Sequence, residues 1–237
     1  MKHWILRFFT ANYNILLFLL FLLFVTRPYE YHEIYVGIWK TCLTATLIVA
    51  IFNCSHQRTT KMVISILAIP TIICSWIALV YQTIPILIST GILTALFMLI
   101  CAGSILYHVV LGARVTIETL RGVICAYFLV AFIFGYIYLI TEYISPGTFL
   151  IRGEILPILP QTRFFSEMLY FSFITLLTVG FGDIVAIKEW GQTVVVIEGI
   201  VGQFYIAILV ARLVSVYSLL SDKLLVRKLE KDLISKG

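Results

Sequence analysis

Long apolar runs separated by short polar segments make up most of the chain. Apolar residues are nearly continuous over about residues 5–25, 35–53, 62–81, 85–109, 122–141 and 191–220. A helix that crosses the hydrocarbon core of a bilayer needs about 20 residues of this kind. Because lipid offers the backbone no hydrogen-bond partners, such runs are expected to be helical. The pattern therefore predicts an all-α membrane protein with six transmembrane helices in each subunit.

One further apolar run, over residues 164–177, is about 14 residues long and is too short to cross. It follows a polar, proline-containing stretch over 142–163 and precedes the glycine-containing segment 178–183. This arrangement predicts a re-entrant helix over 164–177, in a segment that enters the membrane and leaves on the same side. The two glycines of segment 178–183 have access to backbone conformations that other residues avoid, so we expect irregular, extended backbone after the helix.

Composition supports the membrane interpretation and narrows the function. The chain has 237 residues, is 61% hydrophobic and 12% charged, and has a mean hydropathy of +1.05. Soluble domains carry about 25% charged residues. No basic patch with interleaved aromatic residues occurs, so the net charge of +5 is attributed to membrane topology and no nucleic-acid partner is expected. The sequence has no nucleophile elbow, phosphate loop or metal-ligand cluster. We therefore expect that the protein is not an enzyme and has no resident cofactor.

The basic residues predict the orientation in the membrane. With an inside N-terminus and six spans, twelve Lys and Arg residues fall at the inner ends of the helices and five at the outer ends. Cytoplasmic loops of membrane proteins are enriched in Lys and Arg. We therefore expect a multi-pass protein of the cell membrane, surrounded by the lipid bilayer, with both termini in the cytoplasm and segment 178–183 entering from outside.

The same pattern divides the chain into parts. Residues 1–111 are expected to form a four-helix membrane domain, followed by an interfacial linker helix at 112–121 or, alternatively, a solvated loop. Residues 122–220 are expected to form a second domain. It would contain an outer helix, the re-entrant helix over 164–177 and an inner helix over 191–220. The basic tail 221–237 either extends the last helix or is a frayed segment held near anionic lipid.

The fourth run argues against one mode of control. A voltage-sensing helix carries repeated Arg or Lys residues, because the energy comes from moving charge through the membrane field. Residues 86–110 contain no Arg, Lys, Asp or Glu. A conventional voltage sensor is therefore not expected, although the number of helices would suit one.

Segment 178–183, with the sequence TVGFGD, offers a way to bind a dehydrated cation. Its backbone can direct several successive carbonyl groups the same way. Four such rows around an axis would replace the water shell of the ion. The first five residues of the segment resemble the selectivity-filter signature of potassium channels, with Phe181 at a position where tyrosine is common.

Residues 114–220 are similar to the pore domain of bacterial potassium channels, a family of small ion channels with a two-helix pore. Three stretches carry the resemblance: LYFSF at 169–173, TVGFGD at 178–183, and GQFYIA at 202–207 running on to ARLV at 211–214. The resemblance implies a homotetramer that conducts K⁺ as its permeant ligand. It implies ion binding by the filter residues Thr178, Val179, Gly180, Phe181 and Gly182, with K⁺ coordinated by the backbone carbonyls of the first four and by the Thr178 hydroxyl.

Asp183, Tyr170 and Thr175 are expected to support the filter. A buried carboxylate needs a hydrogen-bond donor, and we expect the Tyr170 hydroxyl to donate to Asp183; the alternative is an exposed Asp183 in the outer mouth. Leu177 stands where the family often has threonine, and Ile174 stands where some relatives have an acid. These departures predict a filter that relies more on packing than on hydrogen bonds.

Two residues of the inner helix stand out. Gly202 lies where many family members have a glycine that lets the helix bend, and it is a hinge candidate; close helix packing is the alternative. Glu198 lies within apolar sequence, and an acid in a membrane span is a functional candidate. It is either a protonation site that gates the pore or a neutral, hydrogen-bonded acid that locks helix packing.

The sequence therefore predicts a potassium-selective channel without a conventional voltage sensor. One alternative is a subunit of a potassium transporter, but such systems carry four pore repeats in one chain and this sequence has one. Another is a non-conducting subunit that modulates other channels. The stimulus that opens the pore does not follow from the motifs.

Overall fold

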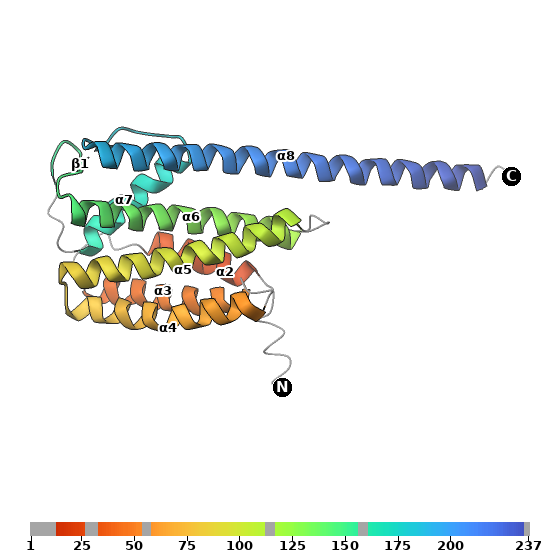
Figure 1. Ribbon diagram of the computed structural model, residues 1–237. Coiled ribbons are helices and arrows are strands. Elements are labelled where there is room, and N and C mark those ends of the chain that lie inside the picture. Colours follow the sequence, from red (N-terminus) through yellow and green to blue (C-terminus); the bar gives the residue numbers. More distant parts are fainter. Residues whose placement is uncertain (1–12, 27–32, 54–57, 112–116, 156–160, 235–237) are drawn as a thin grey trace.

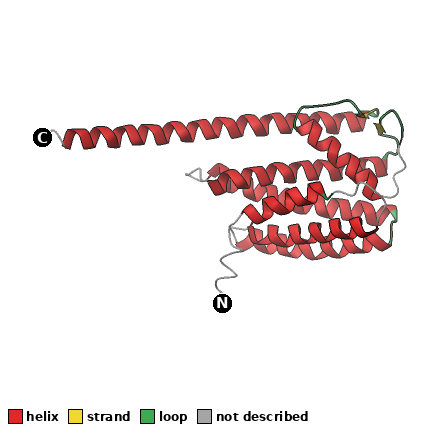
Figure 2. Cartoon of the chain, turned by 180° about the vertical axis from the view of Figure 1, so that it is seen from behind, coloured by secondary structure: helices red, strands yellow, loops and turns green. Residues whose placement is uncertain are grey.

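The computed structural model describes residues 13–26, 33–53, 58–111, 117–155 and 161–234. A bundle of helices from the first half of the chain lies along one side of α6, and the long helix α8 lies along the other (Figure 1). The short helix α7 crosses obliquely between α6 and α8. Figure 2 shows the same layers from behind, with the two short strands at the end of the molecule opposite the C-terminus.

Four helices form the bundle: α2 (Tyr13–Val25), α3 (Glu33–Asn53), α4 (Arg58–Val80) and α5 (Ile84–Leu111). In α2 the buried residues Tyr13, Leu16, Leu20 and Leu23 recur every three or four positions, which places them on one helix face. Opposite faces are apolar and exposed, with Phe18 and Phe21 as examples. Exposed apolar surface of this kind suits contact with lipid.

The second half of the chain contains α6 (Ile117–Ile144), β1 (Phe149–Ile151), α7 (Gln161–Leu176), β2 (Ile184–Ala186) and α8 (Glu189–Ile234). Helix α6 is the most enclosed of the long helices, because α2 and α5 pack on one side of it and α7 and α8 on the other. Strands β1 and β2 pair antiparallel, with Phe149 opposite Ala186 and Ile151 opposite Ile184. Their pairing brings together the chain that leads into α7 and the chain that follows segment 178–183.

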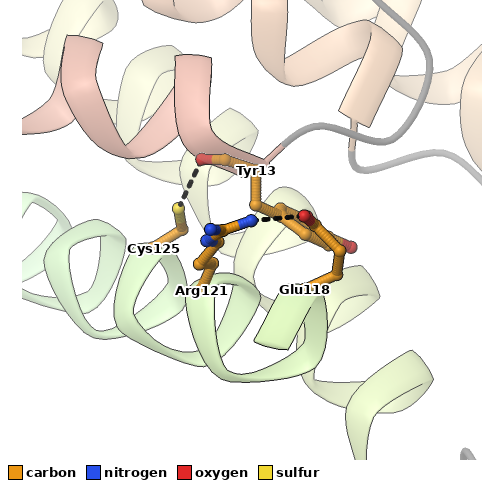
Figure 3. Close-up of polar contacts among 4 residues, drawn as sticks. All are labelled: Tyr13, Glu118, Arg121 and Cys125. Atoms are coloured by element: carbon orange, nitrogen blue, oxygen red, sulfur yellow. Dashed lines mark hydrogen bonds and ion pairs between the residues drawn. The ribbon is translucent and has the colours of Figure 1, made fainter. Parts of the chain in front are cut away.

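The bundle meets α6 at the start of that helix (Figure 3). The Cys125 thiol lies 3.7 Å from the backbone oxygen of Tyr13, and a Cβ placed on Gly122 would lie 3.2 Å from the Tyr13 ring. Arg121 and Glu118 form an ion pair beside this contact, with 2.5 Å between nitrogen and oxygen. The first turn of α2 is therefore packed directly against the backbone of α6.

Aromatic side chains extend this contact to the pore helix. The rings of Phe24 on α2 and Phe173 on α7 lie 4.6 Å apart, and those of Trp39 on α3 and Phe165 on α7 lie 5.4 Å apart. Phe165 also packs against Tyr136 of α6 at 4.4 Å. Such ring pairs stabilise packing by about 0.5–1.5 kcal/mol beyond buried area. The front bundle thus supports α7 from the side.

The helices agree with much of the predicted pattern. Five are long and apolar enough to cross a membrane, and they correspond to the predicted second to sixth spans. The apolar helix α2 is shorter, with 13 residues, and the first part of the predicted span 5–25 lies outside the described residues. The first of the six predicted spans is thus not confirmed. Helix α7 spans Gln161–Leu176, against the predicted 164–177.

Three features differ from the prediction. Helix α6 begins at Ile117, so residues 117–121 of the predicted linker helix are its first turn, and residues 112–116 lie outside the described residues. Helix α8 continues to Ile234, which corrects the predicted end at 220. Of the two predictions for the tail, this length supports the one in which the tail extends the last helix, rather than the frayed segment. The two-stranded sheet was not predicted, since each strand is only three residues long.

A buried carboxylate holds the turn between α6 and β1. Glu142 is 1% exposed, and its side chain accepts hydrogen bonds from the backbone N–H groups of Gly147 (2.5 Å), Thr148 (2.9 Å) and Phe149 (3.2 Å). The Lys188 ammonium adds a bond of 2.6 Å to the carbonyl oxygen of Pro146. The side chain of Glu142 therefore fixes the path of the chain into the sheet.

We expect Glu142→Gln to loosen this turn. Glutamine presents an N–H₂ group to backbone N–H donors, which leaves at least one buried donor without an acceptor, and such a loss costs about 1–3 kcal/mol. The variant should unfold at a lower temperature in detergent, and the amides of Gly147 to Phe149 should exchange hydrogen faster. The control is Glu154→Gln, whose side chain is exposed. Equal exchange in both variants would contradict the role of Glu142.

Candidate functional site

The pore helix α7 ends in a defined hydrogen-bonded cap. The N–H of Thr178 donates to the carbonyl of Thr175 (2.9 Å), and the N–H of Val179 donates to the carbonyl of Ile174 (2.9 Å). Thr178 has a φ of 57°. These two bonds around a left-handed residue form the Schellman motif, which usually has glycine at that position. Threonine there is a conformational outlier that costs about 1–3 kcal/mol.

The cap determines where the next carbonyls point. In a trans peptide unit the C=O and the N–H point in opposite directions. The N–H groups of Thr178, Val179 and Gly180 all point back to the end of α7, the last through a 3.3 Å bond to Ile174. The carbonyl groups of the same peptide units, which belong to Leu177, Thr178 and Val179, therefore point away from the helix.

Left-handed backbone recurs at every second residue of the segment. Thr178, Gly180 and Gly182 have positive φ, whereas Val179 and Phe181 do not. Alternation of handedness keeps successive peptide units turned to the same side of an extended chain. Glycine at two of the three positions removes the steric penalty for this conformation. The sequence TVGFG therefore has the residue types that such a backbone requires, except at Thr178.

The segment is uncovered in the single chain. The side chains of Leu177, Val179 and Phe181 are exposed, Phe181 to 71%. A cavity of about 480 Å³ borders the segment, lined by Thr178, Gly180 and Gly182 together with residues of α7, β2 and α8. One row of carbonyls cannot surround an ion. The geometry is that of one wall of a binding site.

The outer end of the segment is tied to the sheet. The carbonyl of Asp183 accepts a bond of 2.6 Å from the N–H of Arg152, and β2 begins at the next residue. The Arg152 guanidinium forms an ion pair of 3.6 Å with Glu167 of α7. The segment is therefore held at its inner end by α7 and at its outer end by the loop after β1.

The predicted support of the filter by Asp183 is only partly visible. Atom Oδ1 of Asp183 is buried and accepts no hydrogen bond within the described part of the chain. The bond from the Tyr170 hydroxyl to Asp183 stays a prediction. Thr175 contributes through its backbone carbonyl, which accepts the bond from Thr178.

Behind α7, Glu198 connects three helices. It is fully buried, and its carboxyl group lies within hydrogen-bond distance of the Tyr138 hydroxyl on α6 and of the Ser172 hydroxyl on α7. The Ser172 oxygen is also 2.8 Å from the carbonyl oxygen of Ala131 on α6. The Tyr138 hydroxyl interacts in addition with the side chain of Thr175. These groups join the outer helix, the pore helix and the inner helix.

Gly202 lies against the end of the pore helix. A Cβ at this position would be 2.8 Å from the carbonyl oxygen of Leu176 and 3.2 Å from its Cα. Helix α8 is continuous from Glu189 to Ile234. The contact favours the close-packing interpretation of Gly202, and its role as a hinge stays a prediction. Three residues further on, the Tyr205 hydroxyl donates to the carbonyl of Val123 on α6 at 2.5 Å.

The structure gathers the predicted residues of α7 and segment 178–183 in one place, with Glu198 and Gly202 behind them. Sequence reasoning missed three residues that contact them, Tyr138, Ser172 and Arg152. It also missed Glu142, which holds the turn before β1. Ser172 belongs to the LYFSF stretch that carried the family resemblance, but its neighbour Glu198 follows 26 residues later. No periodic pattern connects such positions, so only the packing of three helices identifies the pairs.

Part of the chain matches a known protein family. Residues 122–218 match the family model described as "Ion channel". No curated protein and no solved structure matches the chain. The match covers most of α6, all of α7 and segment 178–183, and the apolar part of α8 from Glu189 to Ala211. It supports an ion channel, a class of multi-pass membrane protein. Residues 1–121 lie outside the match.

We expect Gly202→Ala to disturb the end of the pore helix. The added methyl group would overlap the Leu176 carbonyl, and overpacking of this kind costs about 1–3 kcal/mol. The matched control is Gly199→Ala on the same helix, where no atom lies within 4 Å and alanine favours the helix by up to about 1 kcal/mol. Thermal unfolding in detergent measures both. A Gly202→Ala protein as stable as the control would contradict the packing role.

Proposed function

We propose that the protein is a potassium-selective channel that conducts K⁺ passively through a pore formed by four copies of the chain. The observation that carries the proposal is the backbone of segment 178–183. The N–H groups of Thr178, Val179 and Gly180 bond to the end of α7, and the carbonyls of Thr178 and Val179 point the other way. The match of residues 122–218 to an ion-channel family supports the same function.

Carbonyl oxygens suit potassium for a physical reason. The ion must lose its water shell to enter a narrow pore, and rings of backbone carbonyls replace that shell without a fixed negative charge. With the Thr178 hydroxyl at the inner end and the carbonyls of Thr178, Val179, Gly180 and Phe181 above it, four copies would provide successive rings. Ions at neighbouring rings repel one another, which allows them to leave.

Two features of the single chain support assembly. The filter segment is exposed along its length, and the apolar part of α8, from Glu189 to Ala211, is only 11% buried. In α6, from Glu118 to Ile144, 67% of the residues are buried. Helix α8 therefore needs lipid or further protein around it. A homotetramer around the filter axis would cover the filter side chains and one face of α8 at once.

The front bundle lacks the means to act as a conventional voltage sensor. Helix α5 contains no Arg, Lys, Asp or Glu between Ile84 and Leu111. The buried cation of the bundle within the described residues is Lys40 of α3, whose ammonium lies 3.3 Å from the Ser75 hydroxyl. One charge provides little gating energy compared with the several charges of a voltage sensor. We propose that α2 to α5 support the pore through their aromatic contacts with α7.

The test is current through the purified protein in a planar bilayer with K⁺ and Na⁺ on opposite sides. We expect a reversal potential that follows the K⁺ gradient. Gly180→Ala should abolish the current or its selectivity, because alanine resists the left-handed conformation at φ 53° by about 1–2 kcal/mol in each copy. The matched control, Gly103→Ala on α5, adds a methyl group to open space and should conduct normally.

Three results would decide against the proposal. A reversal potential that ignores the K⁺ gradient would exclude potassium selectivity. Equal currents from Gly180→Ala and Gly103→Ala would exclude segment 178–183 as the conducting site. Folded tetramers without current would favour the alternative of a non-conducting subunit that modulates other channels, and a stable monomer would contradict the pore as described.

A further inference from the structure

The second half of the chain contains two buried glutamates with opposite surroundings. Glu142 is 1% exposed and Glu198 is 0% exposed. Within the described residues, the hydrogen-bond partners of Glu142 are backbone N–H groups, which can only donate. Three donors around one carboxyl group suit an ionised carboxylate, which can only accept. The contacts of Glu198 are two hydroxyl groups, and a hydroxyl can both donate and accept.

Counting hydrogens distinguishes the two states of Glu198. Three contacts need a hydrogen: Tyr138 with Glu198, Ser172 with Glu198, and Ser172 with the carbonyl of Ala131. The carbonyl oxygen can only accept, so the single hydrogen of Ser172 belongs to that contact. Tyr138 provides the second hydrogen. The third, between Ser172 and Glu198, has no source except the carboxyl group itself.

We propose that Glu198 carries its proton in the folded protein and donates it to the Ser172 hydroxyl, so that a neutral carboxylic acid positions the pore helix. The hydrogen bonds then run in one direction. Tyr138 donates to the carbonyl oxygen of the acid, the acid donates to Ser172, and Ser172 donates to the Ala131 carbonyl. Each donor has an acceptor, which is the condition for a polar network inside an apolar environment.

An ionised Glu198 would fit this environment poorly. The Ser172 hydrogen would be divided between two acceptors, and a full negative charge would lie within a membrane span. The titratable groups that interact with Glu198 in the described residues are the hydroxyls of Tyr138 and Tyr127, both on α6. Helix α7 contributes the Ser172 hydroxyl to Glu198, and its Thr175 side chain interacts with the Tyr138 hydroxyl. No basic side chain forms an ion pair with Glu198 in the part of the chain that the structure describes.

The proton gives Glu198 a role in positioning the filter. Ser172 lies in the second half of α7, and Thr175, one turn later, accepts the bond from Thr178. A neutral acid can donate its proton to the Ser172 oxygen. The hydrogen of the Ser172 hydroxyl then remains available for the bond to the Ala131 carbonyl of α6. The acid thereby fixes α7 relative to α6 and α8 without adding a charge near the ion path. This role of the Glu198 proton does not depend on which ion the pore conducts.

Infrared difference spectroscopy of the full-length protein in lipid tests the proposal. The wild-type minus Glu198→Gln spectrum should contain a protonated-carboxyl C=O band at neutral pH and no matching carboxylate bands. The control difference, wild type minus Glu154→Gln, should contain carboxylate bands only. Glutamine keeps one acceptor for Tyr138 and one donor for Ser172, so Glu198→Gln should keep its thermal stability. Carboxylate bands in the Glu198 difference would overturn the proposal.

Ser172→Ala provides a second variant that keeps the acid. We expect its protonated-carboxyl band to remain and to shift to higher frequency, because the acid loses the acceptor of its hydrogen. Conversion of that band to carboxylate bands, or its absence from wild type, would show that Glu198 is ionised. If Glu198→Gln fails to assemble, the spectra of wild type and Ser172→Ala can still be compared, with Glu154→Gln as the control. That comparison still decides whether Glu198 is protonated or ionised.

Discussion

The carbonyl group of Ile174 organises the candidate filter, because it accepts the N–H groups of both Val179 and Gly180. The two bonds stop α7 and reverse the peptide units that follow, so that the next carbonyls point away from the helix. Any displacement of α7 therefore moves the carbonyls with it. The remainder of the second half of the chain can be understood as the means by which α7 is held in place.

Three sets of contacts hold that helix. The front bundle reaches it through Phe24 and Trp39, and α8 reaches it through Gly202, where only hydrogen fits against Leu176. Glu198 joins it to α6 and α8 through hydroxyl groups. Packing is directionless, whereas hydrogen bonds specify one register. The combination explains how a helix too short to cross the membrane keeps a single position.

At the outer end, polar contacts replace apolar packing. Glu142 fixes the turn into β1, β1 pairs with β2, and Arg152 holds the carbonyl of Asp183. Backbone groups there need protein partners wherever lipid or neighbouring side chains exclude water. The acid that fixes this end has only donors around it, while Glu198 faces groups that also accept. The same residue type therefore accepts bonds from backbone N–H groups in one place and, as we propose, is a neutral acid in the other.

The sequence alone predicted the five long apolar helices and singled out segment 178–183 as the candidate site. Twenty-residue apolar runs, a short run before TVGFG and glycines at alternate positions are local features, and local features follow from composition and spacing. It did not determine that Glu198 meets Ser172 and Tyr138, that Glu142 caps a turn, or that Gly202 touches Leu176. Those contacts join residues far apart in the chain and depend on how α6, α7 and α8 cross. The short strands also escaped prediction, since three residues carry too little pattern and their pairing comes from the closure of the loop around α7.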